Sequence, residues 1–144
     1  FCVNELMEAE KLRKQGFEQE IIVLGYIPPE FAKDAVELDV IPVIYSTEVT
    51  DALKQAARVL NKAVSVILKV ETGTNRQGLM PKQVLDLASE INYMPGVNLL
   101  GLSTHFADIE DTTDHAFAMK QLQRFMETAD YLRKNGIDPG RLSA

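Results

Sequence analysis

A lysine and an arginine stand on either side of a glycine turn, directly after an apolar run that predicts a strand. Lys69 lies in the apolar run 63–70, and Gly73 separates it from Arg76. The guanidinium of an arginine is a planar fork of donors that stays protonated, so it suits a ligand oxygen that keeps a negative charge. A lysine beside it adds repulsion, which Glu71, a bound anion or chemical neutralisation of the lysine could relieve. These residues predict a local site for an anionic ligand.

His105 is the third candidate site residue. It closes the run 97–105, which predicts the next strand along the chain. Neighbouring parallel strands lie about 4.8 Å apart, so inward side chains at one level are near neighbours. His105 is therefore expected to lie close to Lys69 at the carboxyl ends of the strands, which we call the rim. Taken singly, Lys69 or Arg76 could be a solvated or locally paired cation, and His105 could be a core histidine bonded to a backbone carbonyl. The three residues together predict a site.

Other ligand classes have weaker support. No Gly-x-x-x-x-Gly-Lys-Ser/Thr segment is present, so the glycines near Arg76 do not predict a nucleotide-phosphate loop. The acidic residues Asp108, Glu110, Asp111 and Asp114 lack the glycine and the terminal glutamate of a calcium loop. They are interpreted as a solvated loop before a helix, and no metal site is predicted.

The overall charge disfavours some partners. The 144 residues carry a formal net charge of −6, which argues against nucleic acid and anionic membrane surfaces. No apolar run approaches the ~20 residues needed to cross a bilayer, and the one cysteine, Cys2, cannot form an internal disulfide. These features predict a cytoplasmic protein. The start at Phe1, with neither an initiator methionine nor a signal segment, predicts an excerpt of a longer product.

Strands and helices are expected to alternate along the chain. Strands are predicted at 1–3, 21–24, 40–45, 63–70, 97–105 and from 141, and helices at 5–15, 29–38, 49–60, 81–92 and 114–135. This order, with short connections and no hairpin signals, is typical of parallel βαβ units in an α/β protein. A doubly wound sheet and a closed barrel both satisfy it, and polar groups at the strand ends favour the barrel. The prediction is a single domain, 1–144, forming an internal portion of a (β/α)8 TIM-type barrel that lacks its first and last strands.

Three local features follow from the same pattern. Asn4 is expected to cap the first helix. Pro42 is the weak point of its strand, because proline cannot donate to a ladder. In the run that ends at His105, strict alternation would place Leu100 and Leu102 together on the opposite face from the histidine.

Five blocks of the sequence, taken in order, resemble a known family. They are Phe-Cys-Val-Asn-Glu-Leu (1–6), Ile-Val-Leu-Gly (22–25), Leu-Lys-Val-Glu-Thr-Gly-Thr-Asn-Arg-Gln-Gly (68–78), Gly-Leu-Ser-Thr-His-Phe-Ala (101–107) and the stretch 121–125. Their order and spacing are similar to those of the N-terminal barrel domain of alanine racemase over essentially the whole chain. The resemblance implies a partial barrel of the type that binds pyridoxal 5′-phosphate (PLP).

The resemblance further implies an enzyme that interconverts L- and D-alanine by removing the alpha proton of a substrate imine. It implies a homodimer with a second, β-rich domain, and a role in D-alanine biosynthesis for peptidoglycan precursors. The Schiff-base lysine of the cofactor and the opposing catalytic tyrosine would lie outside this chain. None of the four tyrosines, Tyr26, Tyr45, Tyr93 and Tyr131, is at a matching position. The chain alone is therefore expected to be inactive.

The resemblance also implies roles for residues of this chain. Arg76 would bond the phenolic oxygen of the cofactor. Lys69, when carbamylated, would become an anion that pairs with Arg76. His105 would lie against the cofactor region, and Leu24 would lie near the cofactor ring.

Departures from the family pattern leave the substrate open. The family usually has aspartate at Glu71, commonly methionine at Thr74 and often leucine at Gln77. One alternative is a racemase of another amino acid such as serine, or a racemase domain attached to a membrane segment. Another is a non-catalytic PLP-binding barrel protein that serves PLP homeostasis, although such carriers have a serine-rich pattern where Arg76 stands.

Overall fold

The computed structural model describes residues 1–109 and 115–144, and each element of this part of the chain lies within or close to its predicted range. The strands are β1 (Cys2–Val3), β2 (Ile22–Val23), β3 (Ile41–Ile44), β4 (Val64–Lys69), β5 (Val97–Ser103) and β6 (Arg141–Ser143). The helices are α1 (Leu6–Lys14), α2 (Ala32–Glu37), α3 (Thr47–Leu60), α4 (Pro81–Asn92) and α5 (Ala116–Lys134), with a 3-10 turn, η1 (Pro29–Phe31), before α2.

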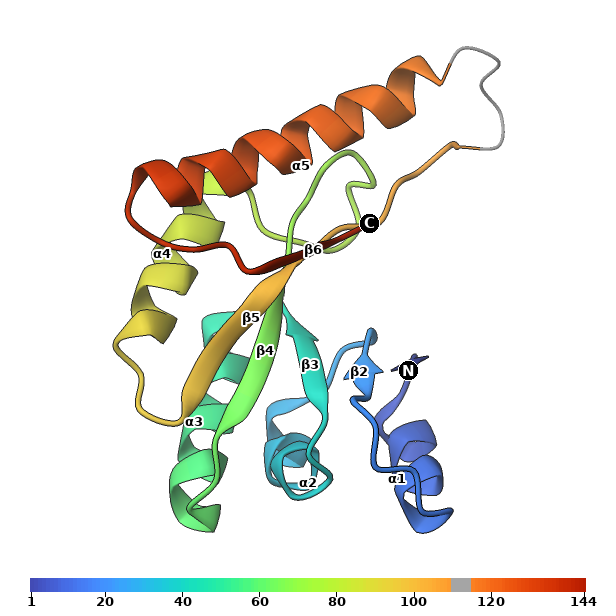
Figure 1. Ribbon diagram of the computed structural model, residues 1–144, viewed down its shortest axis with the longest axis vertical. Coiled ribbons are helices and arrows are strands. Elements are labelled where there is room, and N and C mark those ends of the chain that lie inside the picture. The colour runs from blue at the N-terminus through green and yellow to red at the C-terminus, as the bar shows by residue number, and fades with distance from the viewer. Residues whose placement is uncertain (110–114) are drawn as a thin grey trace.

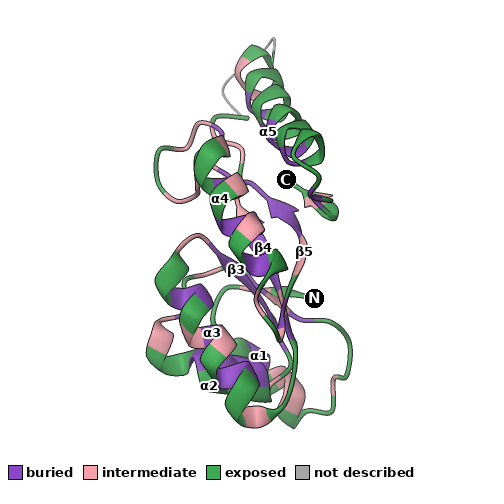
Figure 2. Ribbon diagram, turned by 90° about the vertical axis from the view of Figure 1, so that its left-hand side faces the viewer, coloured by how far each residue is buried: buried purple, intermediate pink, exposed green. Residues whose placement is uncertain are grey.

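The six strands form one parallel sheet in sequence order, β1-β2-β3-β4-β5-β6. The sheet curls into a half-barrel, and helices α1 to α4 lie on one side of it (Figures 1 and 2). A doubly wound sheet would reverse its strand order at a switch point, and the sheet of the described residues does not. The predicted α/β fold, a partial TIM-type barrel, is confirmed.

Two apolar clusters cover the two faces of the sheet. The large cluster, between the strands and the helices, includes Val66, Leu68 and Val70. The small cluster, on the opposite face inside the curl, consists of Ile41, Val43 and Ile67, with Ile22 and Leu100 packed against it. Burial of apolar side chains on both faces is typical of parallel sheets. It leaves the strand ends as the place for polar side chains.

A bulge in β5 changes its side-chain directions from those predicted. Consecutive residues of β4 pair with Leu99 and Gly101, so Leu100 is an extra residue on β5. Leu100 packs against the small inner cluster, whereas Leu102 belongs to the large outer one. The prediction that Leu100 and Leu102 share a face is wrong, because a bulge adds one residue and shifts the alternation.

Pro42 lies inside the buried strand β3. The N–H of Ile41 donates to the carbonyl of Ile21 on the β2 side (2.8 Å), so the nitrogen of Pro42 points toward β4. The β3–β4 ladder begins one residue later, at Val43. The donor that proline lacks therefore falls outside the ladder, which explains how the strand tolerates it.

The cap of α1 differs from the prediction. Glu5, and not Asn4, is the N-cap residue, so that prediction is wrong. The carboxylate of Glu8 reaches back and accepts hydrogen bonds from the N–H groups of Asn4 (2.8 Å) and Glu5 (3.0 Å), in the manner of a capping box. In α3, Ser46 is the N-cap residue, and its hydroxyl accepts from the N–H of Val49 (3.3 Å).

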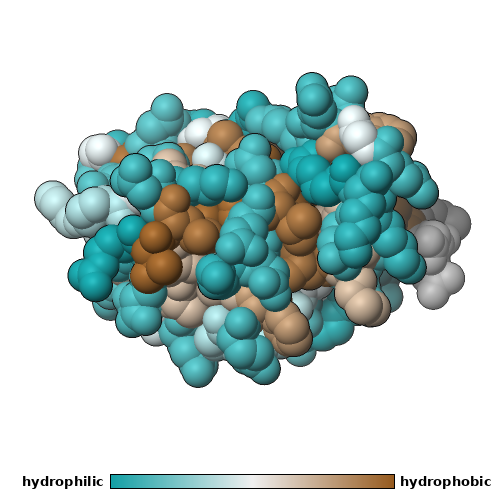
Figure 3. All heavy atoms as spheres, turned by 90° about the horizontal axis from the view of Figure 1, so that it is seen from below, coloured by the Kyte–Doolittle hydropathy of each residue, from teal (hydrophilic) through white to brown (hydrophobic). Residues whose placement is uncertain are grey.

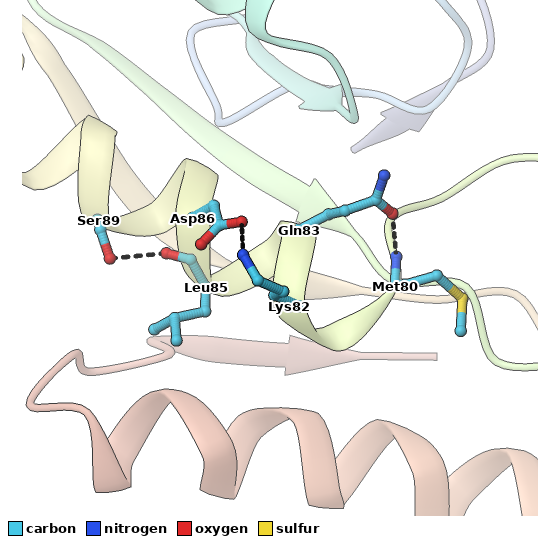
Figure 4. A network of polar contacts seen from close by, with 6 residues as sticks. All are labelled: Met80, Lys82, Gln83, Leu85, Asp86 and Ser89. Atoms are coloured by element: carbon cyan, nitrogen blue, oxygen red, sulfur yellow. Dashed lines mark hydrogen bonds and ion pairs between the residues drawn. The ribbon is translucent and has the colours of Figure 1, made fainter.

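Helix α4 begins at Pro81, a favourable first residue for a helix. The side chain of Gln83 accepts a hydrogen bond from the N–H of Met80 (2.9 Å), and Lys82 pairs with Asp86 one turn later (2.7 Å). Figure 4 shows these contacts along the exposed side of the helix. These contacts between neighbouring residues stabilise the first turns of α4.

Helix α5 runs over Ala116–Lys134 and ends before Gly136, as predicted. Its predicted start, Asp114, and the acidic residues Glu110 and Asp111 lie outside the described residues. Within residues 1–109 and 115–144, no helix is long and apolar enough to span a membrane, and no three His, Cys, Asp or Glu side chains are grouped to hold a metal ion.

The amino ends of the strands form the face opposite the predicted site. There Arg141, at the start of β6, makes a two-pronged ion pair with Glu20, just before β2, with a shortest distance of 2.7 Å. This contact joins segments 121 positions apart in the sequence. Figure 3 views the molecule from this side and shows apolar patches between polar side chains. In barrels of this type the amino-terminal face serves stability, and chemistry takes place at the other end.

Candidate active site at the carboxyl ends of the strands

Lys69 is the last residue of β4 and pairs with Ser103 of β5. Burial lowers the pKa of its ammonium group, the nearby Arg76 guanidinium lowers it further, and the carboxylate of Glu71 acts in the opposite direction. The net change is downward. Lys69 therefore has a larger fraction of neutral, nucleophilic amine at a given pH than a solvated lysine has.

A turn closed through the main chain brings Arg76 back to the end of β4. The N–H of Leu79 donates to the carbonyl of Lys69 (2.8 Å), and the N–H of Glu71 donates to the carbonyl of Leu79 (2.9 Å). Gly78 has a φ of 134°, and a Cβ on it would lie 2.7 Å from the nitrogen of Glu71. Glycine is required there because the turn passes so close to the strand. The turn thus returns the exposed Arg76 toward Lys69, near enough for its charge to lower the pKa of Lys69.

Glu71 is bound by the turn itself. Its carboxylate accepts hydrogen bonds from the N–H of Gly73 and the hydroxyl of Thr74 (3.0 Å). Burial raises the pKa of Glu71, but the nearby main-chain amides of Asn75, Gly73 and Arg76, together with the Thr74 hydroxyl, outweigh burial and lower it. Both carboxylate oxygens of Glu71 accept hydrogen bonds from the turn. The negative charge of Glu71 therefore offsets only part of the repulsion between Lys69 and Arg76.

His105 lies two residues beyond the end of β5 and is exposed. Next to it, the buried hydroxyl of Thr104 bonds the hydroxyl of Thr72 (2.7 Å) and donates to the carbonyl of Val70 (3.0 Å). These bonds tie the segment that carries His105 to the turn that carries Arg76. The structure places both residues at the same end of adjacent strands.

Helix α5 fastens the same two segments. The side-chain amide of Gln121 accepts from the N–H of Ala107 (2.8 Å) and donates to its carbonyl (2.9 Å), and Arg124 donates to the carbonyl of Thr72 (2.9 Å). Neither residue is predicted from the sequence. Gln121 does fall on the buried stripe of the helix with Phe125, and an amide in such a stripe signals a buried hydrogen-bond partner.

Replacing Gln121 with alanine is expected to lower the free energy of unfolding by about 2–4 kcal/mol, because each buried group left unsatisfied costs about 1–3 kcal/mol and Ala107 would lose two partners. Urea or thermal unfolding of the complete protein measures this loss. Gln123→Ala is the matched control, since Gln123 lies on the exposed side of the same helix and donates to Glu127 (2.8 Å). Equal losses in the two variants would contradict the role assigned to Gln121.

Leu24 and Tyr45 supply the apolar part of the rim. Leu24 follows β2, is exposed, and donates its N–H to the carbonyl of Val3 (2.9 Å). Tyr45 follows β3, and the β3–β4 register places it level with Lys69. Its ring lies 6.1 Å from that of Tyr26, and burial, with a contribution from Tyr26, raises the pKa of its phenol. Tyr45 is not predicted as a rim residue, because its position depends on strand register.

The rim therefore suits a small ligand that is anionic at one point and flat and apolar elsewhere. Arg76 offers a fork of donors for an anionic oxygen, and Leu24 and Tyr45 offer apolar surface. The inward positions of β5 nearest the rim are occupied by the small residues Gly101 and Ser103. This donor set fits the phenolic oxygen and the aromatic ring of a pyridoxal cofactor.

Comparison with known proteins points to one family. Residues 1–144 match the family model described as alanine racemase, N-terminal domain. An alanine racemase of Desulfovibrio desulfuricans is 37% identical over 135 residues, which cover 94% of this chain and 36% of the relative. The solved alanine racemase of Clostridium difficile 630 in complex with cycloserine has a TM-score of 0.91 at 25% identity, covering 99% of this chain and 39% of that one. A histidine racemase from Leuconostoc mesenteroides subsp. sake has a TM-score of 0.88 at 25% identity, covering 100% of this chain and 38% of that one.

The match extends over the whole chain and does not depend on one motif. The chain spans a little more than a third of the length of the curated relatives it matches. The curled parallel sheet agrees with the same assignment, since alanine racemases are among the proteins of similar structure. The chain therefore belongs to the alanine racemase family, as part of its N-terminal domain.

Proposed function

We propose that the complete protein containing this chain is a PLP-dependent enzyme that interconverts L- and D-alanine. The observation that carries this assignment is the turn that holds Arg76 beside Lys69 at the carboxyl end of the half-barrel. The chain would be an internal portion of a (β/α)8 barrel and inactive alone, with the lysine that binds the cofactor and a β-rich domain supplied by the rest of the protein. The sequence resemblance supports a cytoplasmic homodimer.

The residues of this chain would hold and tune the cofactor. Bound PLP supplies an electron sink that makes the alpha proton of an amino acid acidic. Arg76 would present its fork of N–H donors to the phenolic oxygen and keep its positive charge at any working pH. His105 would contact the cofactor region from the end of the next strand, and Leu24 would offer apolar contact to the ring.

Lys69 would act through Arg76 in carbamylated form. The lone pair of the neutral Nζ attacks the carbon of CO2, the nitrogen releases a proton to water, and a carbamate anion results. An anion would then replace a repelling cation beside the guanidinium. The lowered pKa of Lys69 supports this step, because only the neutral amine reacts.

The complete protein supplied with 13C-bicarbonate is expected to show a carbamate carbon signal by NMR. Lys69→Ala should abolish this signal, and raising the pH toward the pKa of Lys69 should strengthen it, because deprotonation precedes the reaction. Lys82→Ala should leave it unchanged, since Lys82 is exposed and its hydrogen bond to Asp86 (2.7 Å) raises its pKa. A signal that survives Lys69→Ala would contradict the carbamylation of Lys69.

A racemase of another amino acid is the second candidate, favoured by the likeness to a histidine racemase. The test incubates the PLP-loaded complete protein with L-alanine, L-serine or L-histidine and follows each D-enantiomer by chiral chromatography. We expect the highest kcat/KM for alanine. A higher value for serine or histidine would reassign the substrate, and bound PLP with no D-enantiomer from any of the three would favour a non-catalytic PLP carrier.

A further inference from the structure

One side chain organises the middle of the turn after β4. The carboxylate of Glu71 accepts from the N–H of Gly73 with one oxygen and from the hydroxyl of Thr74 (3.0 Å) with the other. The main-chain amides of Asn75 and Arg76 lie close enough to this carboxylate to lower its pKa. One group that follows directly on the strand thus bonds two residues of the turn and attracts the amides of the next two.

The backbone of this turn needs such support. Asn75 has a φ of 50°, a left-handed conformation that a residue with a side chain adopts at a cost. Its side chain donates to the carbonyl of Gly73 at 3.4 Å, which is a long contact. The hydrogen bond between Glu71 and Thr74, the residue before Asn75, therefore adds support to this conformation.

The same carboxylate faces the two cations of the rim. Glu71 follows Lys69 by two positions in extended chain, so the two side chains point to the same inward face. Burial and Arg76 lower the pKa of Lys69, and the negative charge of Glu71 opposes them. A fixed negative charge at this point stabilises an arginine beside a lysine.

We propose that Glu71 is the positioning residue for Arg76. Its carboxylate fixes the main chain from Gly73 to Arg76, and this fixed main chain sets where the guanidinium lies over the rim. This role rests on the proposed function and deepens it, because the Glu71 carboxylate would place the Arg76 guanidinium that binds the cofactor. The side chain acts through Arg76 and need not touch substrate.

Two substitutions separate this role from general support of the fold. Glu71→Gln keeps the size but replaces one acceptor oxygen by an NH2 group, which cannot accept from a main-chain amide, and removes the charge. Glu71→Asp keeps the charge and both acceptor oxygens at a shorter reach. Glu127→Gln is the matched control, because Glu127 is exposed on α5 and accepts from Gln123.

Steady-state racemisation by the complete PLP-loaded protein provides the test. Glu71→Gln should lower kcat by roughly 10- to 100-fold, since a misplacement of about 1 Å in an active site can cost a factor of about a hundred. KM for alanine should change far less, Glu71→Asp should lose less than Glu71→Gln, and Glu127→Gln should match the wild type. The double variant Glu71→Gln/Arg76→Lys should be no slower than Arg76→Lys, because residues that act through one another are not additive.

The outcomes distinguish this inference from the proposed function. A wild-type protein that racemises no amino acid would refute the function itself. Two results with an active wild type and an impaired Arg76→Lys variant would overturn the role of Glu71. One is full kcat in Glu71→Gln. The other is a double variant whose loss equals the two single losses combined. Should Glu71→Gln fail to fold, Thr74→Val removes one donor to the carboxylate, and we expect a smaller loss of kcat that disappears in the Arg76→Lys background. Full kcat in Thr74→Val would then overturn the proposal.

Discussion

Replacing Arg76 with lysine in the complete protein is expected to lower kcat for alanine racemisation by about 10²- to 10³-fold, the usual effect of removing one preorganised donor from an active site. Lysine keeps the positive charge but loses the planar fork of donors. Its single ammonium group would also pair less well than the planar fork with the proposed carbamate of Lys69. The measurement is initial-rate kinetics at saturating PLP, with cofactor occupancy checked by absorbance.

Arg133→Lys is the matched control for this substitution. Arg133 lies in the last turn of α5 and forms an exposed ion pair with Asp130 (2.7 Å), away from the rim. Its replacement should leave kcat unchanged. If Arg76→Lys retained the wild-type rate at full cofactor occupancy, the assignment of Arg76 to the cofactor would be wrong.

Replacing Gly101 with alanine is expected to destabilise the complete protein by about 1–3 kcal/mol or more, as overpacking of a closely packed interior does. A Cβ at Gly101 would overlap the carbonyl oxygen of Arg141 on the neighbouring strand β6, and would lie 3.0 Å from the carbonyl carbon. Backbone cannot yield as a flexible side chain can, so β5 and β6 must separate. The melting temperature at fixed PLP concentration should fall, and racemisation should fall with it because β5 leads to His105.

Gly16→Ala serves as the control for adding a methyl group. Gly16 has a φ of 85°, which is unfavourable for alanine, but nothing lies within 4 Å of the added Cβ. It should cost about 1 kcal/mol, the usual penalty of placing a side chain in a conformation suited to glycine, and leave kcat unchanged. A loss in Gly101→Ala no greater than that in Gly16→Ala would show that the β5–β6 contact is not tight.

The order of strands and helices follows from local pattern. In β4, Val64, Val66 and Leu68 alternate with Ser65 and Ile67, and the structure buries the first three against the helices. The turn that returns Arg76 toward Lys69 also depends on nearby residues alone, because two main-chain hydrogen bonds and one close-fitting glycine within 69–79 close it. Such features are visible in a window of about ten residues.

The bulge in β5 lies beside a segment that is distant in the sequence. Gly140 approaches Leu100 so closely that a Cβ on Gly140 would overlap the carbonyl oxygen of Leu100. Forty positions separate these two residues, and alternation within 97–105 carries no trace of that contact. The wrong assignment of Leu100 and Leu102 to one face follows from the extra residue in β5, which strict alternation does not include.

The support of the site is non-local in the same way. Gln121 and Arg124 hold the segments of Ala107 and Thr72 from α5, through hydrogen bonds that span 14 and 52 positions. Tyr45 reaches the level of Lys69 only through the register of two strands. Sequence motifs could therefore name the charged residues of the rim, but not the polar contacts that hold them in place.

We propose that this half-barrel belongs to an enzyme that removes and returns the alpha proton of alanine with PLP. Proton NMR and chiral chromatography of L-alanine, incubated in D2O with the PLP-loaded complete protein, test this most directly. We expect loss of the alpha-proton signal together with formation of D-alanine, until the two enantiomers are equal. We also expect the same end point from D-alanine and no reaction without PLP. Stoichiometric PLP binding with L-alanine that keeps both its alpha proton and its configuration would contradict the proposed racemase activity.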